Sequence, residues 1–173
     1  MVGRRTAAAA RALGLVCALW AGSAKAGRVV GYESEYPPGA IVISQSAKTL
    51  YLILGPRTAI AYPVAVGKHG KEWSGLAHVE GKYVAPAWSP PGSVKRDHPE
   101  LPDVIPGGSP HNPMGARAIT LDRDEIAIHG TTQAMRASVG TAASYGCIRM
   151  YNEDVIDLFD RVAIGAPVVM MTR

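Results

Sequence analysis

Short apolar runs, each ended by glycine or proline, most constrain what this chain can fold into. Residues 41–44 and 49–54 indicate the two strands of a hairpin, and residues 59–66 and 77–84 indicate two further strands. Pro63 lies inside the third run and predicts an edge strand or a bulge, because proline cannot donate a hydrogen bond to a sheet. With 19 glycines and 13 prolines among 173 residues, the pattern favours a turn-rich β domain over a helical bundle.

The second half of the chain continues this pattern and adds one helix. Residues 119–121 and 125–128 predict short strands, and residues 167–171 predict a final buried strand. Asn152 is a good N-cap for a helix over residues 153–162, whose apolar positions recur at helical spacing. The length of the chain fits a single domain.

Between these halves lies a long segment that is rich in proline. Residues 86–113 contain eight of the thirteen prolines, together with Trp88, His98 and His111. A loop of this length in a compact domain is usually functional or disordered. We therefore predict a flap that faces the substrate, in preference to a plain linker.

The first 26 residues have the features of a secretory signal peptide. Three arginines come before or at the start of an apolar run over residues 12–20, and residues 24–26 (Ala-Lys-Ala) supply a cleavage motif. The run is too short for a lasting anchor, so we expect no membrane span after cleavage and a location in the periplasm or cell envelope. An amphipathic helix of the mature fold is the alternative.

The charge distribution argues against nucleic acid as a partner. The formal net charge is +4, and the predicted leader carries four basic side chains and no acid. From Gly27 onward the basic and acidic side chains are therefore equal in number. A neutral domain lacks the basic surface by which DNA and RNA are bound.

Cleavage of the leader also changes the cysteine count. Cys17 lies within the apolar run of the leader, so Cys147 is the one cysteine of the mature chain. An exported protein with one cysteine cannot form an internal disulfide. Its thiol is either buried and inert or kept for chemistry.

The residues around Cys147 favour chemistry. An imidazole close to a thiol can activate it as a nucleophile, and His129 follows an apolar alternation that places it at a strand end. The Gly130 carbonyl is positioned to orient the imidazole. The amides of Gly146 and Cys147 are candidate oxyanion donors. Arg149 is suited to a bidentate contact with a substrate carboxylate.

Each of these residues also has a purely structural interpretation. Cys147 and His129 are each common as buried structural residues, and Arg149 has the alternative of pairing with an acid of the following helix. The other histidines of the mature chain lack the spacing of metal ligands, so no metal site is predicted.

The combined pattern resembles the L,D-transpeptidase catalytic domain, the YkuD-like family of bacterial cell-wall enzymes. The resemblance rests on His129-Gly-Thr and on the motif over residues 144–152, Ser-Tyr-Gly-Cys-Ile-Arg-Met-Tyr-Asn. Residues 112–115 (Asn-Pro-Met-Gly) are similar to a turn of the same family. The resemblance implies a catalytic domain over residues 40–173, preceded by an N-terminal extension over residues 27–39. It also implies a mainly β fold: a mixed β-sandwich with one or two short helices and a long flap loop.

The activity implied by the resemblance is peptidoglycan transpeptidation. The Cys147 thiolate attacks the carbonyl of the third stem residue, usually diaminopimelate, and releases D-alanine. The acyl group then passes to an amine: that of another stem peptide, of a lysine in an envelope protein, or of a free D-amino acid. His129 is implied as the base, with Gly130 orienting it and with Gly146 and Cys147 forming the oxyanion hole. The substrate-binding residues implied are Arg149, Ser144, Tyr145 and Asn112. No metal or organic cofactor is expected, and carbapenems are the inhibitors implied.

The sequence departs from the family pattern at two places. Many relatives have histidine where this chain has Tyr145, and Trp73-Ser74-Gly75 stands where a Thr-Pro-Thr-Gly turn is usual. Two alternatives to transpeptidation remain at this point. One is an L,D-carboxypeptidase or hydrolase that passes the acyl-enzyme to water, and the other is a non-catalytic peptidoglycan-binding domain.

Overall fold

A computed structural model describes residues 26–172 of the chain. The predicted leader lies outside the described residues, apart from Ala26. Within the described part, no helix is both long enough and apolar enough to cross a membrane.

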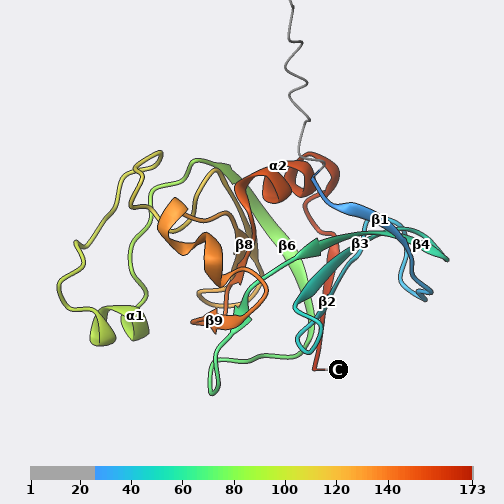
Figure 1. Cartoon of the computed structure of the whole chain (residues 1–173), viewed down its shortest axis with the longest axis horizontal. Coiled ribbons are helices and arrows are strands. Elements are labelled where there is room, and N and C mark those ends of the chain that lie inside the picture. Colours follow the sequence, from blue (N-terminus) through green and yellow to red (C-terminus); the bar gives the residue numbers. More distant parts are fainter. Residues whose placement is uncertain (1–25, 173) are drawn as a thin grey trace, which may run out of the picture.

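The fold is built on a nine-stranded mixed sheet with the strand order β1-β4-β3-β2-β11-β6-β7-β8-β10, and β5 and β9 form a separate parallel pair (Figure 1). The strands are β1 (Arg28–Gly31), β2 (Ile41–Ser44), β3 (Thr49–Gly55), β4 (Thr58–Pro63), β5 (Val66–Gly67), β6 (Gly75–Val84), β7 (Arg117–Leu121), β8 (Ala127–His129), β9 (Ala142–Ser144), β10 (Ile148–Arg149) and β11 (Pro167–Met171). The helices are α1 (Gly92–Asp97), the 3-10 helix η1 (Gln133–Ser138) and α2 (Asn152–Arg161).

The long strand β6 joins the two halves of the sheet. Its first residues, Gly75 to His78, pair with β11, and the residues from Val79 onward pair with β7 across a register shift. Such a shift bends and twists a strand. Ile41 of one half and Ile128 of the other lie in the same buried cluster. The expected mainly β mixed sandwich with few short helices is confirmed.

Helix α2 covers the half of the sheet that carries β7 and β8 (Figure 1). The sequence places Val155, Phe159 and Val162 on one face of this helix. In the structure Val155 and Val162 are buried and Phe159 packs against the core. The apolar stripe therefore anchors α2 on the sheet, with its first turn beside Thr131.

The N-terminal half differs from expectation in two strands. The predicted strand over residues 59–66 ends at Pro63, and pairing resumes at β5. Pairing of β4 with β1 ends at Ala61, so at Pro63 the strand pairs with β3 alone, as expected of an edge position. Strand β1 was not predicted, since its short sequence Arg-Val-Val-Gly carries little signal and its conformation depends on pairing with β4.

The proline-rich loop over residues 86–113 forms a lobe that extends from the sheet on the side away from β1 (Figure 1). It contains α1, and Trp88 and Ile105 bridge it through two backbone hydrogen bonds of 2.9 and 2.8 Å. Asn112 holds the lobe together. Its Nδ2 donates to the carbonyls of Pro86, Ile105 and Pro106, and its Oδ1 accepts from the Met114 amide. Asn112 is expected from the sequence to bind substrate. In the structure it is 2% exposed, and its side chain is hydrogen-bonded to the backbone of the loop.

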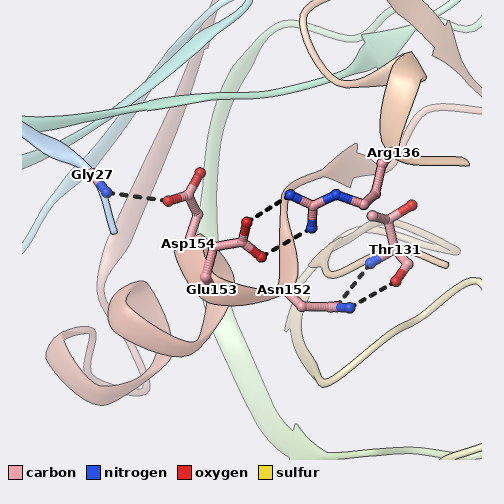
Figure 2. A network of polar contacts seen from close by, with 6 residues as sticks. All are labelled: Gly27, Thr131, Arg136, Asn152, Glu153 and Asp154. Carbon is pink, nitrogen blue, oxygen red and sulfur yellow. Dashed lines mark hydrogen bonds and ion pairs between the residues drawn. The ribbon is translucent and has the colours of Figure 1, made fainter. Parts of the chain in front are cut away.

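Asn152 does not cap α2 as predicted. Tyr151 occupies the N-cap position, and Asn152 is the first helical residue. Its Oδ1 accepts from the Ala116 amide at 3.0 Å. The same Oδ1 accepts from the Thr131 amide at 3.1 Å, and its Nδ2 donates to the Thr131 carbonyl at 2.9 Å (Figure 2). A Cβ at Gly130 would lie 2.1 Å from this Oδ1, so glycine is required there.

We predict that Asn152→Ala destabilises the domain by about 2–3 kcal/mol, because it leaves backbone groups of two segments without partners. Asn152→Asp keeps the oxygen that accepts from both amides and should cost less. Urea unfolding of the three proteins measures the difference. Equal stability of Asn152→Ala and the unmodified chain would contradict this role.

Candidate active site

Cys147 lies in a tight turn between β9 and β10 that is held by side chains. The Ser144 hydroxyl accepts from the Gly146 amide at 3.1 Å and donates to the Cys147 carbonyl at 2.5 Å. From outside, Trp73 Nε1 donates to the Gly146 carbonyl at 3.1 Å. Gly146 has φ 122°, a conformation that side chains rarely adopt, and a Cβ there would lie 2.8 Å from Ile126 Cδ1. The turn therefore needs glycine at this position.

These contacts bear on two of the expected roles. Ser144 is buried and its hydroxyl is engaged on both sides within the turn. The Gly146 amide, expected as an oxyanion donor, already donates to that hydroxyl. The structure therefore gives Ser144 a role in shaping the turn and does not leave the Gly146 amide free.

The Cys147 thiol is half-buried and points at a backbone carbonyl. Its Sγ donates to the Glu125 oxygen at 3.3 Å. Glu125 itself has a positive φ of 60°, which is uncommon for a residue with a side chain. Burial raises the pKa of the Cys147 thiol, against the opposing effects of the Ala127 amide and the Arg149 charge. At neutral pH the resting thiol is therefore protonated.

The imidazole of His129 is buried at the end of β8 and is 3% exposed. Its Nδ1 lies 2.8 Å from the Gly130 oxygen. Because a carbonyl only accepts, Nδ1 carries the hydrogen and Nε2 is left to take a proton. Burial, reinforced by the charge of Arg149, lowers the pKa of His129 to about 4, although the Gly130 and Pro113 carbonyls oppose this effect. The imidazole is thus neutral near pH 7.

Parallel pairing of β8 and β10 brings the histidine and the cysteine together. Arg149 pairs with His129, and Ile148 pairs with Ile128. Side chains alternate along a strand, and paired residues face the same side of a sheet. His129 and Arg149 therefore share one face with Cys147, while Ile128 and Ile148 point into the core.

That face forms the floor of a cavity of about 430 Å³. The floor contains Cys147, His129 and Arg149. The loop over residues 86–113 supplies one wall, mainly through apolar side chains. The residues of this wall are Trp88, Pro91, Ser93, Val94, His98, Leu101, Ile105, His111 and Pro113. The predicted flap therefore covers the predicted nucleophile.

A second cavity, of about 760 Å³, also reaches Cys147. It shares Trp88, Pro91, Met114, Glu125 and Cys147 with the first cavity. Its charged lining residues are the acids Glu80, Asp122, Asp124 and Glu125 and the base Arg123. The thiol thus lies where the two cavities meet.

Arg149 is a buried cation without a carboxylate partner among residues 26–172. Its Nη1 donates to the Ser138 hydroxyl at 2.7 Å, and its buried Nε has no partner there. The alternative pairing with an acid of α2 is not seen: Glu153 pairs with Arg136, and Asp157 pairs with Arg161. A buried guanidinium with free donors at a cavity floor is suited to an entering carboxylate.

Tyr145, at the position of the family histidine, joins the turn of Cys147 to the covering loop. Its hydroxyl donates to Asp97 of α1 at 2.6 Å, and the Lys68 ammonium lies 3.7 Å from its ring centre. The Tyr145 hydrogen bond, followed by the Lys68 charge, lowers the pKa of Asp97. Tyr145 lines the first cavity, and its hydroxyl is engaged with the loop.

Sequence analysis missed three contributors to this site. The Trp73 indole donates a hydrogen bond to the turn, the Glu125 carbonyl accepts one from the thiol, and the Ser138 hydroxyl accepts one from Arg149. The sequence offers one signal for these contributors: Trp73 stands where the family usually has a different turn. Among residues 26–172, no group of three or more histidine, cysteine, aspartate or glutamate side chains is arranged to hold a metal ion.

Comparison with known proteins places this geometry in a family. The sequence model of YkuD, the L,D-transpeptidase catalytic domain, matches residues 38–170. The probable L,D-transpeptidase YbiS of Escherichia coli strain K12 is 34% identical over 138 residues, which cover 75% of this chain and 43% of that protein. The chain thus spans less than half the length of this curated relative.

Two solved structures are also similar. One, from Brucella melitensis and described as a probable carnitine operon oxidoreductase, is 39% identical with a TM-score of 0.55, and the match covers 83% of this chain and 92% of that one. The other, the L,D-transpeptidase LdtMt1 in complex with imipenem, is 18% identical with a TM-score of 0.58 and covers 76% of this chain and 58% of that one. At that identity the likeness concerns the fold. From the family match over residues 38–170 and the identity to YbiS, this chain belongs to the YkuD family, the L,D-transpeptidase catalytic domain.

Proposed function

We propose that this chain is a peptidoglycan L,D-transpeptidase of the cell envelope that works through Cys147. The observation that carries the proposal is a thiol and a neutral imidazole that line one cavity, with His129 at the end of β8 and Cys147 in the turn that leads into the adjoining parallel strand β10. Family membership supports the same reaction class. The predicted leader supports an envelope location.

In the first half of the reaction, Cys147 leaves the Glu125 carbonyl and attacks the carbonyl carbon of the third stem residue. Nε2 of His129 takes the thiol proton as the carbon–sulfur bond forms. The Cys147 amide is the donor placed for the oxyanion, since the Gly146 amide is engaged with Ser144. Collapse breaks the peptide bond, and D-alanine leaves with the proton that His129 held.

In the second half, an amine attacks the thioester carbon and His129 removes its proton. The new amide forms, the carbon–sulfur bond breaks, and the thiolate recovers the proton. The second cavity supports an amine acceptor, since it reaches Cys147 and its four carboxylates outnumber the one guanidinium, Arg123, which favours entry of a cationic group. A stem peptide or a lysine of an envelope protein carries such a group. The ammonium loses a proton to solvent before the neutral amine attacks.

Two features favour transfer to an amine over transfer to water. The wall formed by the loop is largely apolar, with Trp88, Leu101 and Ile105 facing the cavity. Arg149 is placed to fix a carboxylate of the donor peptide, which orients the acyl carbon over the thiol.

Both residues expected of an active enzyme, Cys147 and His129, are present, which argues against a non-catalytic binding domain.

We predict that the mature domain, given a disaccharide-tetrapeptide, releases D-alanine and forms a cross-linked dimer. The Cys147→Ala variant should do neither, because the acyl-enzyme cannot form. Mass spectrometry distinguishes the products. Tripeptide without dimer would indicate hydrolysis, and no change in a sample whose Cys147 is still alkylated by iodoacetamide would contradict the proposal.

The pH dependence should reflect the buried imidazole. Because the pKa of His129 is lowered to about 4, the base is neutral above about pH 5 and protonated below about pH 4. We expect kcat/KM to stay level from about pH 5 to about pH 8 and to fall as the pH drops through the His129 pKa. Alkylation of the free enzyme should instead rise with pH into the alkaline range, because the pKa of the thiol is raised. A fall in kcat/KM centred near pH 6.5 would contradict a buried base.

Imipenem, which is bound in the related LdtMt1 structure, should acylate Cys147. The same thiol and base that attack a stem peptide would open the β-lactam ring, so the intact mass should rise by one imipenem. The Cys147→Ala protein is the control and should keep its mass. An unmodified wild-type protein after prolonged incubation would count against an activated thiol.

A further inference from the structure

The backbone nitrogen of Gly27 lies against a buried carboxylate. It donates to Asp154 Oδ1 at 3.1 Å, across 127 residues of sequence (Figure 2). Asp154 belongs to the first turn of α2 and is 5% exposed. Gly27 immediately follows the predicted cleavage motif, so this nitrogen is the one that leader removal would convert from an amide to an amine.

The position of Gly27 accepts only glycine. Its φ is +67°, and a Cβ there would lie 2.5 Å from both Ile60 Cγ2 and Tyr62 Cε1. Strand β1 begins at the next residue and pairs with β4, which fixes the direction of the chain. The pairing of β1 with β4 and the hydrogen bond to Asp154 therefore hold the Gly27 nitrogen in place.

Asp154 is short of positive charge. Among residues 26–172 it forms no ion pair, and its hydrogen-bond donor is the neutral Gly27 amide. Arg136 is bound to both oxygens of Glu153, at 3.0 and 2.7 Å. Burial, together with the charges of Glu153 and Asp157, raises the pKa of Asp154. The titratable and charged groups around this carboxylate are Glu153 and Asp157 of α2, Arg136 of η1, Tyr62 of β4, Tyr151 and Arg28.

We propose that this is a receptor site for the processed N-terminus of the chain, in which the α-ammonium of Gly27 pairs with Asp154 once the leader is removed. A cavity of about 480 Å³ beside Gly27, lined by Tyr62, Tyr151 and Asp154 among others, leaves room for the extra hydrogens of the ammonium. The inference rests on cleavage after Ala26 and is independent of the proposed transpeptidation.

The pairing links processing to the helix beside the base. Asp154 and Asn152 lie in the same first turn of α2, and Asn152 holds Thr131 two residues after His129 (Figure 2). An ammonium beside Asp154 supplies the missing charge, so the mature chain is more stable than one whose Gly27 nitrogen is blocked. Pairing raises the pKa of the amine above its unfolded value of about 7.7–8.0. While Asp154 is ionised, the added stability is full below that value and is lost as pH rises through the folded pKa of the amine. In acid it is also lost as Asp154 takes up a proton.

The test compares two forms of residues 27–173 that differ in one group: a free Gly27 amine and an Nα-acetylated Gly27. Acetylation keeps the N–H donor and removes the charge. At about pH 6.5 we expect the folding equilibrium constant of the free amine to be about tenfold larger, as one unit of pKa shift corresponds to tenfold. The difference should vanish near pH 11 and in an Asp154→Asn background. It should persist in Asp160→Asn, which removes an exposed acid of the same helix.

Equal stability of the two forms at about pH 6.5, or a difference that persists in Asp154→Asn, would overturn the proposal. If Asp154→Asn does not fold, the pKa of the ¹⁵N-labelled Gly27 amine in the unmodified mature chain decides by NMR. A value above about 8 supports the pairing and a lower value refutes it. N-terminal sequencing of the exported protein should begin at Gly27, and any other first residue would also refute it.

Discussion

The parallel pairing of β8 with β10 is the constraint on which the site depends. It fixes His129 opposite Arg149 and brings Cys147 to the same face, while the intervening isoleucines anchor both strands in the core. Strand β10 is short and is held on its other side by Ala65, through hydrogen bonds of 2.8 and 3.0 Å. Two residues of regular pairing thus bring His129 and Cys147, which are eighteen positions apart in sequence, to one cavity.

Burial decides the charge state of this pair. The same low-polarity surroundings lower the pKa of His129 and raise that of Cys147, so each group rests in its neutral form. In the proposed mechanism, the thiol proton therefore moves to the imidazole only when a substrate carbonyl is present to receive the attack. Arg149, whose own pKa is lowered by burial, keeps a positive charge beside both groups. A carboxylate of the substrate would offset that charge.

The sequence allowed the strands at residues 41–54, the helix α2 and the pair Cys147 and His129 to be predicted, because alternation and motif spacing are local signals. It did not reveal strand β1 or the roles of Asn152 and Asn112. Each of these depends on a partner distant in sequence, such as the Thr131 amide for Asn152, and a side chain that bonds remote backbone leaves no local pattern. The predicted N-cap at Asn152 was wrong for the same reason, since the amides of two neighbouring segments compete for its oxygen.

The contact between Tyr145 and α1 lies at the surface, and this has a consequence for access to the cavities. The side chains of Lys68 and Asp97 are 41% and 53% exposed. Charges exposed to this degree are screened by dissolved ions, in contrast to the buried groups on the cavity floor. Ionic strength therefore acts on the contact between α1 and the Cys147 turn, while the buried groups on the cavity floor are shielded from the same ions. In the proposed enzyme, substrate entry and bond breaking would then respond to different features of the surroundings.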